Sequence, residues 1–283
     1  MSEPLVSVNL CVWRPDPRFF PQAVESILCQ TFQDFELIIV EDPSEFDGRG
    51  MIAHLLDDPR IRYVKNESRR GLVAQRNQAL ELSRGRFVAI LDADDVAKPE
   101  RLARQIGFLH QSPEIKVLGS WLEIIDENGK LIGLRKYPAT HEEISRAIRR
   151  FNPIAQPAVV FDKELALSLG AYQGEPFAED YDLWARMFVQ GARFANLEMP
   201  LVQYRLHSET SKKKRLRDLL RRTIRIKTQY FGNSLRWSDR LRILAEYGLL
   251  CMPPGFVYWL FRVVTIERNR GCLSLFGLPG APP

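Results

Sequence analysis

Three carboxylates stand within four positions directly after an apolar run. They are Asp92, Asp94 and Asp95, in the segment FVAILDADDVAKPERL that covers residues 87–102. Carboxylates this close repel one another, and one of them tends to stay protonated unless a cation balances the charge. A hard divalent cation such as Mg²⁺ or Mn²⁺, held by one or two carboxylates and a diphosphate, is the simplest partner for Asp92 and Asp94. Asp95 alone is better explained as a cap of the following helix.

Strand and helix signals alternate along the sequence around these acids. Apolar runs predict strands at residues 5–12, 35–42, 61–66 and 86–91. Amphipathic patterns predict helices at residues 19–30, 48–56, 72–83 and 99–111. Near-continuous apolar strands that alternate with helices are typical of a parallel sheet covered on both faces. Ligands bind beyond the carboxyl ends of such strands, which is where Glu41, Asp42 and the acids at 92–95 fall.

The pattern changes after residue 115. A tight turn at Asn128-Gly129 predicts a pair of strands, and Thr140 with Glu143 predicts a helix that begins with a capping box. The expected strands here cover residues 116–133, 157–161 and 201–207, and the expected helices cover 139–150 and 179–191. We therefore expect an α/β protein with a Rossmann-like, mostly parallel central sheet, helices on both faces and a helical C-terminal extension.

The composition excludes several classes of protein. With 283 residues, 45% hydrophobic and 27% charged, the chain is long enough to bury a core and is typical of a soluble globular protein. The cysteines form no CxxC pair or Cys/His cluster, which argues against a zinc site or a disulfide framework and fits a reducing cytoplasm. They are Cys11, Cys29, Cys251 and Cys272. The N-terminus lacks a basic region before a long apolar stretch and predicts a strand, not a signal peptide.

The positive charge is concentrated near the C-terminus. Residues 212–242 hold twelve Lys or Arg and two Asp or Glu, a local charge of +10 in a chain whose net charge is +5. Residues 249–264 are apolar and aromatic but are interrupted by Pro253-Pro254, too short a run to span a bilayer. A basic stretch beside an aromatic one suits an anionic membrane surface. Alternatively, these helices pack on the preceding domain; no nucleic-acid-binding module accompanies them.

An Asp-x-Asp pattern is weak by itself, but here several separated motifs occur in one order. They are VSV, SILCQTFQDFELIIVED, GLVAQRNQALELSRGRFVAILDADDVAKPERL, GAYQGEPFAEDYDLWARM and VQYRLHSETS. Together they cover roughly residues 5–211 and resemble the family 2 inverting glycosyltransferases of the GT-A fold. The resemblance implies a GT-A catalytic domain at residues 1–211, followed by a basic, amphipathic helical extension at 212–283.

The resemblance implies that several residues contact the nucleotide of the donor. Asp42 matches the Asp that contacts the base, and a carboxylate can accept from a base N–H. The loop after it, EDPSEFDG, departs from the Asp-Gly-Ser turn that is common in the family. Cys11 and Trp13 fall where a Thr and an aromatic residue are common; Trp13 can stack on a base or only pack. Arg76 and Asn77 match a helix start that attracts anions, with a surface ion pair as the alternative for Arg76.

The acidic strand end corresponds to the D-x-D motif of the family. Asp94 is then the direct metal ligand, Asp92 serves the ribose and the metal shell, and Ala93 between them belongs to the donor-binding residues. His207 matches a His that reaches the metal or the diphosphate. Arg205 serves either the diphosphate or the packing of the strand end.

On the acceptor side, EDYDLW matches the motif that opens a helix. Asp180 then corresponds to the catalytic base and Glu179 to its neighbour. A helix N-terminus stabilises an ionised carboxylate, so Asp180 would accept a proton at neutral pH; alternatively both acids only complement the helix dipole. Gly170 and Gly174 match the loop that approaches the acceptor and the donor sugar.

The resemblance thus implies a metal-dependent inverting glycosyltransferase. It would move a sugar from a nucleotide-diphosphate donor, most often a UDP-sugar, to a hydroxyl of a glycan or lipid-linked acceptor by a single displacement. We expect it in the cytoplasm, peripheral on the inner face of the cytoplasmic membrane. Two alternatives remain: a catalytically inactive nucleotide-sugar-binding or scaffold protein of a polysaccharide-assembly complex, and a basic interaction protein. The intact set Asp92, Asp94, Asp180 and His207 argues against the inactive protein.

Overall fold

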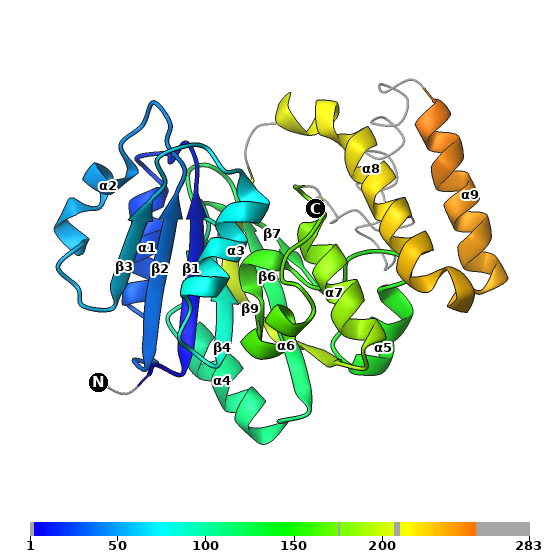
Figure 1. The fold of residues 1–283 in the computed structure, drawn as a ribbon, viewed down its shortest axis with the longest axis horizontal. Coiled ribbons are helices and arrows are strands. Elements are labelled where there is room, and N and C mark those ends of the chain that lie inside the picture. Colours follow the sequence, from blue (N-terminus) through cyan, green and yellow to red (C-terminus); the bar gives the residue numbers. More distant parts are fainter. Residues whose placement is uncertain (1–2, 175, 207–209, 253–283) are drawn as a thin grey trace.

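The first half of the central sheet is parallel. The computed structural model describes residues 3–174, 176–206 and 210–252. Its strands β3 (Ile61–Lys65), β2 (Phe35–Glu41), β1 (Val6–Val12) and β4 (Phe87–Ile90) lie side by side in that order, and each neighbouring pair is parallel. Their carboxyl ends therefore meet at one edge of the sheet (Figure 1).

The second half of the sheet is mixed. The order continues with β8 (Val160–Asp162), β6 (Ile115–Ile125), β9 (Arg193–Arg205) and β5 (Val96–Ala97), while β7 (Leu131–Arg135) pairs with β6. The long ladder between β6 and β9 is parallel, and β8, β5 and β7 pair antiparallel with their neighbours. The expected α/β class with a mainly parallel sheet is confirmed.

Helices cover both faces of the sheet. One face packs against α1 (Phe20–Leu28) and α4 (Arg101–Gln111), whose apolar side chains join the first core cluster. The other face packs against α3 (Leu72–Leu82), α6 (Lys163–Ser168) and α7 (Glu179–Val189). Shorter helices lie in the connections between these elements, namely α2 (Gly48–Met51), η1 (Ala53–Leu55), α5 (His141–Ala147) and η2 (Gln156–Ala158). The capping box at Thr140 and Glu143 is confirmed.

Strand β9 is longer than the sequence predicted. It begins at Arg193, not at residue 201, because its first half pairs in parallel with the first half of β6. The register shifts around Trp121, which lies opposite Pro200. A proline has no N–H to give to a ladder, so this residue hid the continuity of the strand.

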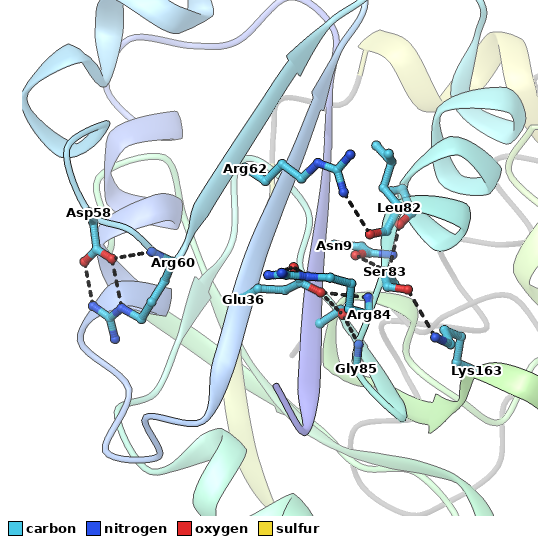
Figure 2. A network of polar contacts seen from close by, with 12 residues as sticks. Asn9, Glu36, Asp58, Arg60, Arg62, Leu82, Ser83, Arg84, Gly85 and Lys163 are labelled. Atoms are coloured by element: carbon cyan, nitrogen blue, oxygen red, sulfur yellow. Dashed lines mark hydrogen bonds and ion pairs between the residues drawn. The ribbon is translucent and has the colours of Figure 1, made fainter. Parts of the chain in front are cut away.

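A polar network fixes the amino-terminal ends of these strands, opposite the acidic edge (Figure 2). Glu36 is buried on β2 and accepts from Ser7 Oγ at 2.7 Å, from the Arg84 backbone N–H at 2.8 Å and from Arg84 Nε at 2.9 Å. Gly85 N–H donates to Ser7 Oγ at 2.8 Å. The turn between α3 and β4 is thereby attached to β1 and β2, which fixes the strand that carries the acids.

The C-terminal extension packs on the rest of the molecule. Helices α8 (Thr210–Phe231) and α9 (Trp237–Cys251) form a hairpin through η3 (Gly232–Ser234). Ile226 and Phe231 of α8 join the core cluster of α7, and Tyr230 Oη donates to Asp182 Oδ1 at 2.9 Å. In the ranges described, no helix combines the length and the apolar character that a membrane span requires. Most of the expected aromatic stretch at 249–264 lies outside the described residues.

Candidate active site

Arg76 connects the acidic strand end with the start of α7. Its guanidinium, from α3, is buried and lies with Nη2 3.4 Å from Asp92 Oδ1 and Nε 3.1 Å from Glu179 Oε1. Burial lowers the pKa of Arg76, but the charges of Glu179 and Asp92 outweigh it and raise the pKa above its usual value. Arg76 therefore stays charged and holds together two acids that are far apart in the sequence.

Asp180 lies directly after Glu179, in the first turn of α7. Its side chain is held by a residue that the sequence did not indicate. Asn152 Nδ2 donates to Asp180 Oδ2 at 2.8 Å, while Asn152 Oδ1 accepts from the Ile154 backbone N–H at 3.2 Å. Burial and the charge of Glu179 raise the pKa of Asp180 to about 7. The helix N-terminus alone predicted a carboxylate that is ready to accept a proton at neutral pH; burial beside a like charge raises its pKa against that effect.

The acids after β4 have different surroundings. Burial raises the pKa of Asp92, with Arg76 opposing and Asp94 and Glu179 adding to the rise. Asp95 is fully buried, and burial with the charges of Asp94 and Asp92 raises its pKa well above the usual range. The expected role of Asp95 as a helix cap is wrong, because α4 begins only at Arg101 and its N-cap position is residue 100.

Asp95 instead receives a bond from strand β9. Its Oδ1 accepts from the Arg205 backbone N–H at 2.9 Å, whereas Oδ2 has no hydrogen-bond partner among the described residues. The Arg205 side chain donates from Nε to the Asp94 carbonyl at 2.9 Å and from Nη2 to Gln22 Oε1 at 3.0 Å. These contacts brace the backbone of the acidic turn, so the geometry favours the packing role for Arg205 over contact with a diphosphate.

Asp42 organises the turn that opens α3. Its fully buried carboxylate accepts from Asn66 Nδ2 at 2.9 Å and from the backbone N–H groups of Arg70 at 2.9 Å and Gly71 at 2.7 Å. Gly71 has a φ of +85°, a conformation that glycine adopts without strain. Contact between Asp42 and a base stays a prediction.

Trp13 and Cys11 lie at the carboxyl end of β1. Trp13 is 38% exposed, and the Arg69 guanidinium carbon lies 3.7 Å from its ring centroid. A cation thus lies against the Trp13 ring, and stacking of a base on this ring stays a prediction. Burial raises the pKa of the Cys11 thiol to about 12, with Arg76 opposing the rise, so Cys11 is a neutral thiol beside the acidic edge.

Asn77 holds the loop before α7. Its Nδ2 donates to the Tyr172 carbonyl at 2.9 Å, and its Oδ1 accepts from the Tyr172 backbone N–H at 2.8 Å. Both polar atoms of the amide are thereby engaged by the loop, which favours a positioning role for Asn77 over contact with a donor. Gly170 and Gly174 have φ values of +83° and +80°, so the turn they form depends on glycine.

The acidic edge offers the donor set that a hard divalent cation prefers. Asp92 is 37% exposed at its side chain, and crowding with Asp94 adds to the rise in its pKa, so a cation here would relieve the repulsion. The residues present therefore fit Mg²⁺ or Mn²⁺. The third expected contributor, His207, lies outside the described residues, and within the described ones no cluster of three His, Cys, Asp or Glu forms a complete metal site. Ala93 lies partly buried between the two acids.

Comparison with known proteins places this arrangement in a family. A family model described as Glycosyl transferase family 2 matches residues 14–163. The O-antigen biosynthesis glycosyltransferase WbnJ of Escherichia coli is 32% identical over 216 residues, which cover 75% of this chain and 84% of that protein. The UDP-Gal:alpha-D-GlcNAc-diphosphoundecaprenol beta-1,3-galactosyltransferase of Escherichia coli is 27% identical over 274 residues, 92% of this chain and 96% of that protein.

The fold has solved relatives as well. The mannosyltransferase PcManGT from Pyrobaculum calidifontis, in complex with GDP-Man and Mn²⁺, aligns with a TM-score of 0.58 and 16% identity over 97% of this chain and 78% of that chain. The shared architecture is the GT-A fold. Because the family model covers more than half of the chain and a relative above 30% identity covers three quarters of it, this chain belongs to glycosyl transferase family 2 and is a glycosyltransferase.

Proposed function

We propose that this enzyme transfers a sugar from a nucleotide-diphosphate donor, expected to be a UDP-sugar, to an acceptor hydroxyl by a metal-dependent, inverting single displacement. The observation that carries the proposal is the Arg76 guanidinium, which joins Asp92 at the acidic strand end to Glu179 beside Asp180. With Asp92 as a donor-binding residue and Asp180 as the base, this ion pair would bring the two ends of the reaction together. The names of a UDP-Gal-dependent relative and a fold neighbour bound to GDP-Man and Mn²⁺ support a nucleotide-sugar donor.

Asp92 and Asp94 would hold the divalent cation, with His207 as the expected third contributor. When bound, the ion supplies Lewis-acid stabilisation of the charge that develops on the leaving diphosphate. Arg76, already charged and buried next to Asp92, adds a second positive charge at the same edge. Arg205 keeps the acidic turn in place through the Asp94 carbonyl and the Asp95 carboxylate.

Asp180 would act as the general base. Asn152 donates to Oδ2 and orients the carboxylate, which would take the proton of the acceptor hydroxyl as the hydroxyl oxygen attacks the anomeric carbon. A base works best when its pKa lies near the working pH, and the pKa of Asp180 is raised to about 7 by burial and by Glu179. Attack on the face opposite the leaving group inverts the anomeric configuration, and the mechanism requires no covalent sugar intermediate.

The acceptor is expected to be a glycan or a lipid-linked sugar of a surface polysaccharide. The names of two relatives support this class of acceptor. One is the O-antigen transferase, and the other is the transferase whose acceptor is a diphosphoundecaprenol-linked sugar. A lipid-linked acceptor would place the enzyme at the inner face of the cytoplasmic membrane. The basic extension formed by α8 and α9 would then be the part that meets the lipid surface.

A thermal-shift panel tests the donor site. The protein is heated with UDP, GDP, dTDP or CMP and with the corresponding sugar nucleotides, each with and without Mn²⁺. We expect one nucleotide to stabilise the wild type only when the metal is present, and Asp94→Ala to lose this shift. Asp218→Ala, which changes an exposed ion pair with Arg221, is the matched control and should keep it. A protein that no nucleotide stabilises under either condition would contradict the proposal.

A further inference from the structure

One side of α9 is apolar and faces away from the protein. Trp237, Leu241, Leu244 and Tyr247 are 74%, 49%, 65% and 48% exposed. They follow one another at intervals of four, three and three residues, which places them along one side of a helix. Figure 1 shows α9 at the outer edge of the molecule, beyond α8. We call these four side chains the α9 face.

The acidic residues of α9 are buried, whereas the apolar residues of the α9 face are exposed. Asp239 is buried and accepts from Arg150 Nε at 2.8 Å. Glu246 is fully buried, and both of its oxygens lie 2.9 Å from Lys227 Nζ on α8. The two acids of the helix are therefore neutralised inside the protein, while Arg240 remains exposed beside the α9 face.

The arrangement is costly in water unless something covers it. Monomeric soluble proteins rarely expose contiguous large apolar side chains, and four of them in one row mark an interaction surface. Packing against α8 explains the opposite side of α9, where Ile243 meets Leu220 and Ile224. It does not explain an aromatic residue that is three-quarters exposed at the first turn.

We propose that the α9 face is the surface by which the enzyme docks on an anionic lipid bilayer. A helix with Trp and Leu on one side and Arg at its margins inserts its apolar side at the level of the headgroups. Residues 212–242 carry a local charge of +10, which an anionic leaflet attracts. The inference deepens the proposed function, on which it rests for a lipid-linked acceptor, by naming the surface that meets the membrane.

Two other groups could cover the α9 face, namely residues 253–283 and a second copy of the chain. The charge of each argues against it. Residues 253–283 contain three Arg and one Glu, so this segment would add positive charge to a helix pair that is already basic. A second copy of the chain would bring the same basic helix pair to the contact. An anionic bilayer complements both the apolar row and its charge.

The test is co-sedimentation of the full chain with vesicles. One set of vesicles contains phosphatidylglycerol and phosphatidylcholine, and the other contains phosphatidylcholine alone. We expect binding to the anionic set that weakens as salt is raised. The double variant Leu241→Gln, Leu244→Gln should bind roughly tenfold or more weakly, because two partly inserted leucines are lost. Leu131→Gln, which changes a 58% exposed leucine of β7, is the matched control and should bind like the wild type.

Three outcomes of these measurements distinguish between the groups that could cover the α9 face. Equal vesicle binding by the double variant and the wild type would overturn the proposal. A large loss of thermal stability in the double variant would show that the chain itself covers the α9 face, and loss of a dimer in light scattering would show a second copy; either result also overturns it. The Mn²⁺-dependent nucleotide shift is measured in the same samples, so a failure of vesicle binding with this shift intact rejects the docking surface and leaves the donor site standing.

Discussion

The side-chain amide of Asn152 donates to Oδ2 of Asp180 at 2.8 Å, and its own oxygen is fixed by the Ile154 backbone N–H. The carboxylate of the proposed base is thereby held from one side by a group that cannot itself titrate. A donor that points at a carboxylate favours its charged form and fixes its orientation. Asn152 is therefore a positioning residue for Asp180. It lies in a loop and not on α7, the helix that carries Asp180.

Replacing Asn152 by Ala should lower kcat on the order of tenfold to a hundredfold, a part of what a positioned base contributes. The acid limb of the pH–rate profile should move to higher pH, because the ionised form of Asp180 loses a donor. The measurement is the rate of nucleoside diphosphate release against pH. Asn128→Ala, at an exposed turn, is the control. A reduced rate with an unmoved pH profile would assign Asn152 a role in folding alone.

The wild-type enzyme should lose activity as the pH falls through about 7, the raised pKa of Asp180. The sign follows from the mechanism, because the base must be deprotonated to take the acceptor proton. Removing the like charge with Glu179→Gln should move the acid limb to lower pH, since Glu179 is the largest charge that raises the pKa of Asp180. An acid limb that stays in place in Glu179→Gln would contradict the coupling between the two acids.

Replacing Arg76 by Met should abolish donor binding and lower the free energy of unfolding by about 3–5 kcal/mol, because the buried Glu179 is left unpaired. The double variant Arg76→Met, Glu179→Gln should recover part of the stability without recovering donor binding. Urea unfolding and nucleotide titration measure the two quantities separately. Donor binding that survives in Arg76→Met would remove Arg76 from the donor site.

Glu36 provides a test of stability away from the site. Burial raises the pKa of Glu36, but the bonds from the Arg84 backbone, Ser7 and the Arg84 side chain outweigh it, and the pKa lies below its usual value. Its contribution to stability is therefore present above the unfolded-state pKa and is lost as the pH falls through the lower folded-state pKa. Glu36→Gln should cost about 1–3 kcal/mol at neutral pH, flatten this acid dependence and leave nucleotide binding intact.

The sequence was sufficient to name Arg76, Asp92, Glu179 and Asp180 as candidate site residues, but not to predict the ion pairs of Arg76 with Asp92 and Glu179. Parallel strands align their carboxyl ends, so acids at those ends meet, and the family motifs assign the remaining partners. The same logic predicted the sheet, although β9 was recognised only in part because Pro200 interrupts its pattern. Local signals of this kind follow directly from backbone geometry.

The contacts that cross long distances in the chain could not be predicted in this way. Asn152 lies in a loop without periodicity, and its partner is 28 residues away. Asp95 has the position of a helix cap in the sequence, yet it accepts from Arg205, 110 residues away. Asn77 and Arg205 carry polar groups that could bind the nucleotide sugar. Only the tertiary structure shows that these groups already form hydrogen bonds with other parts of the chain.

The most direct test of the central claim compares donor binding with donor turnover in Asp180→Asn. The affinity for the nucleotide sugar that stabilises the wild type is measured by calorimetry with Mn²⁺, and release of the nucleoside diphosphate is measured in the same buffer. We expect unchanged affinity and a loss of turnover of roughly a hundredfold or more, because the proposed base is gone while the acidic strand end is intact. Turnover at the wild-type rate in Asp180→Asn would contradict this expectation.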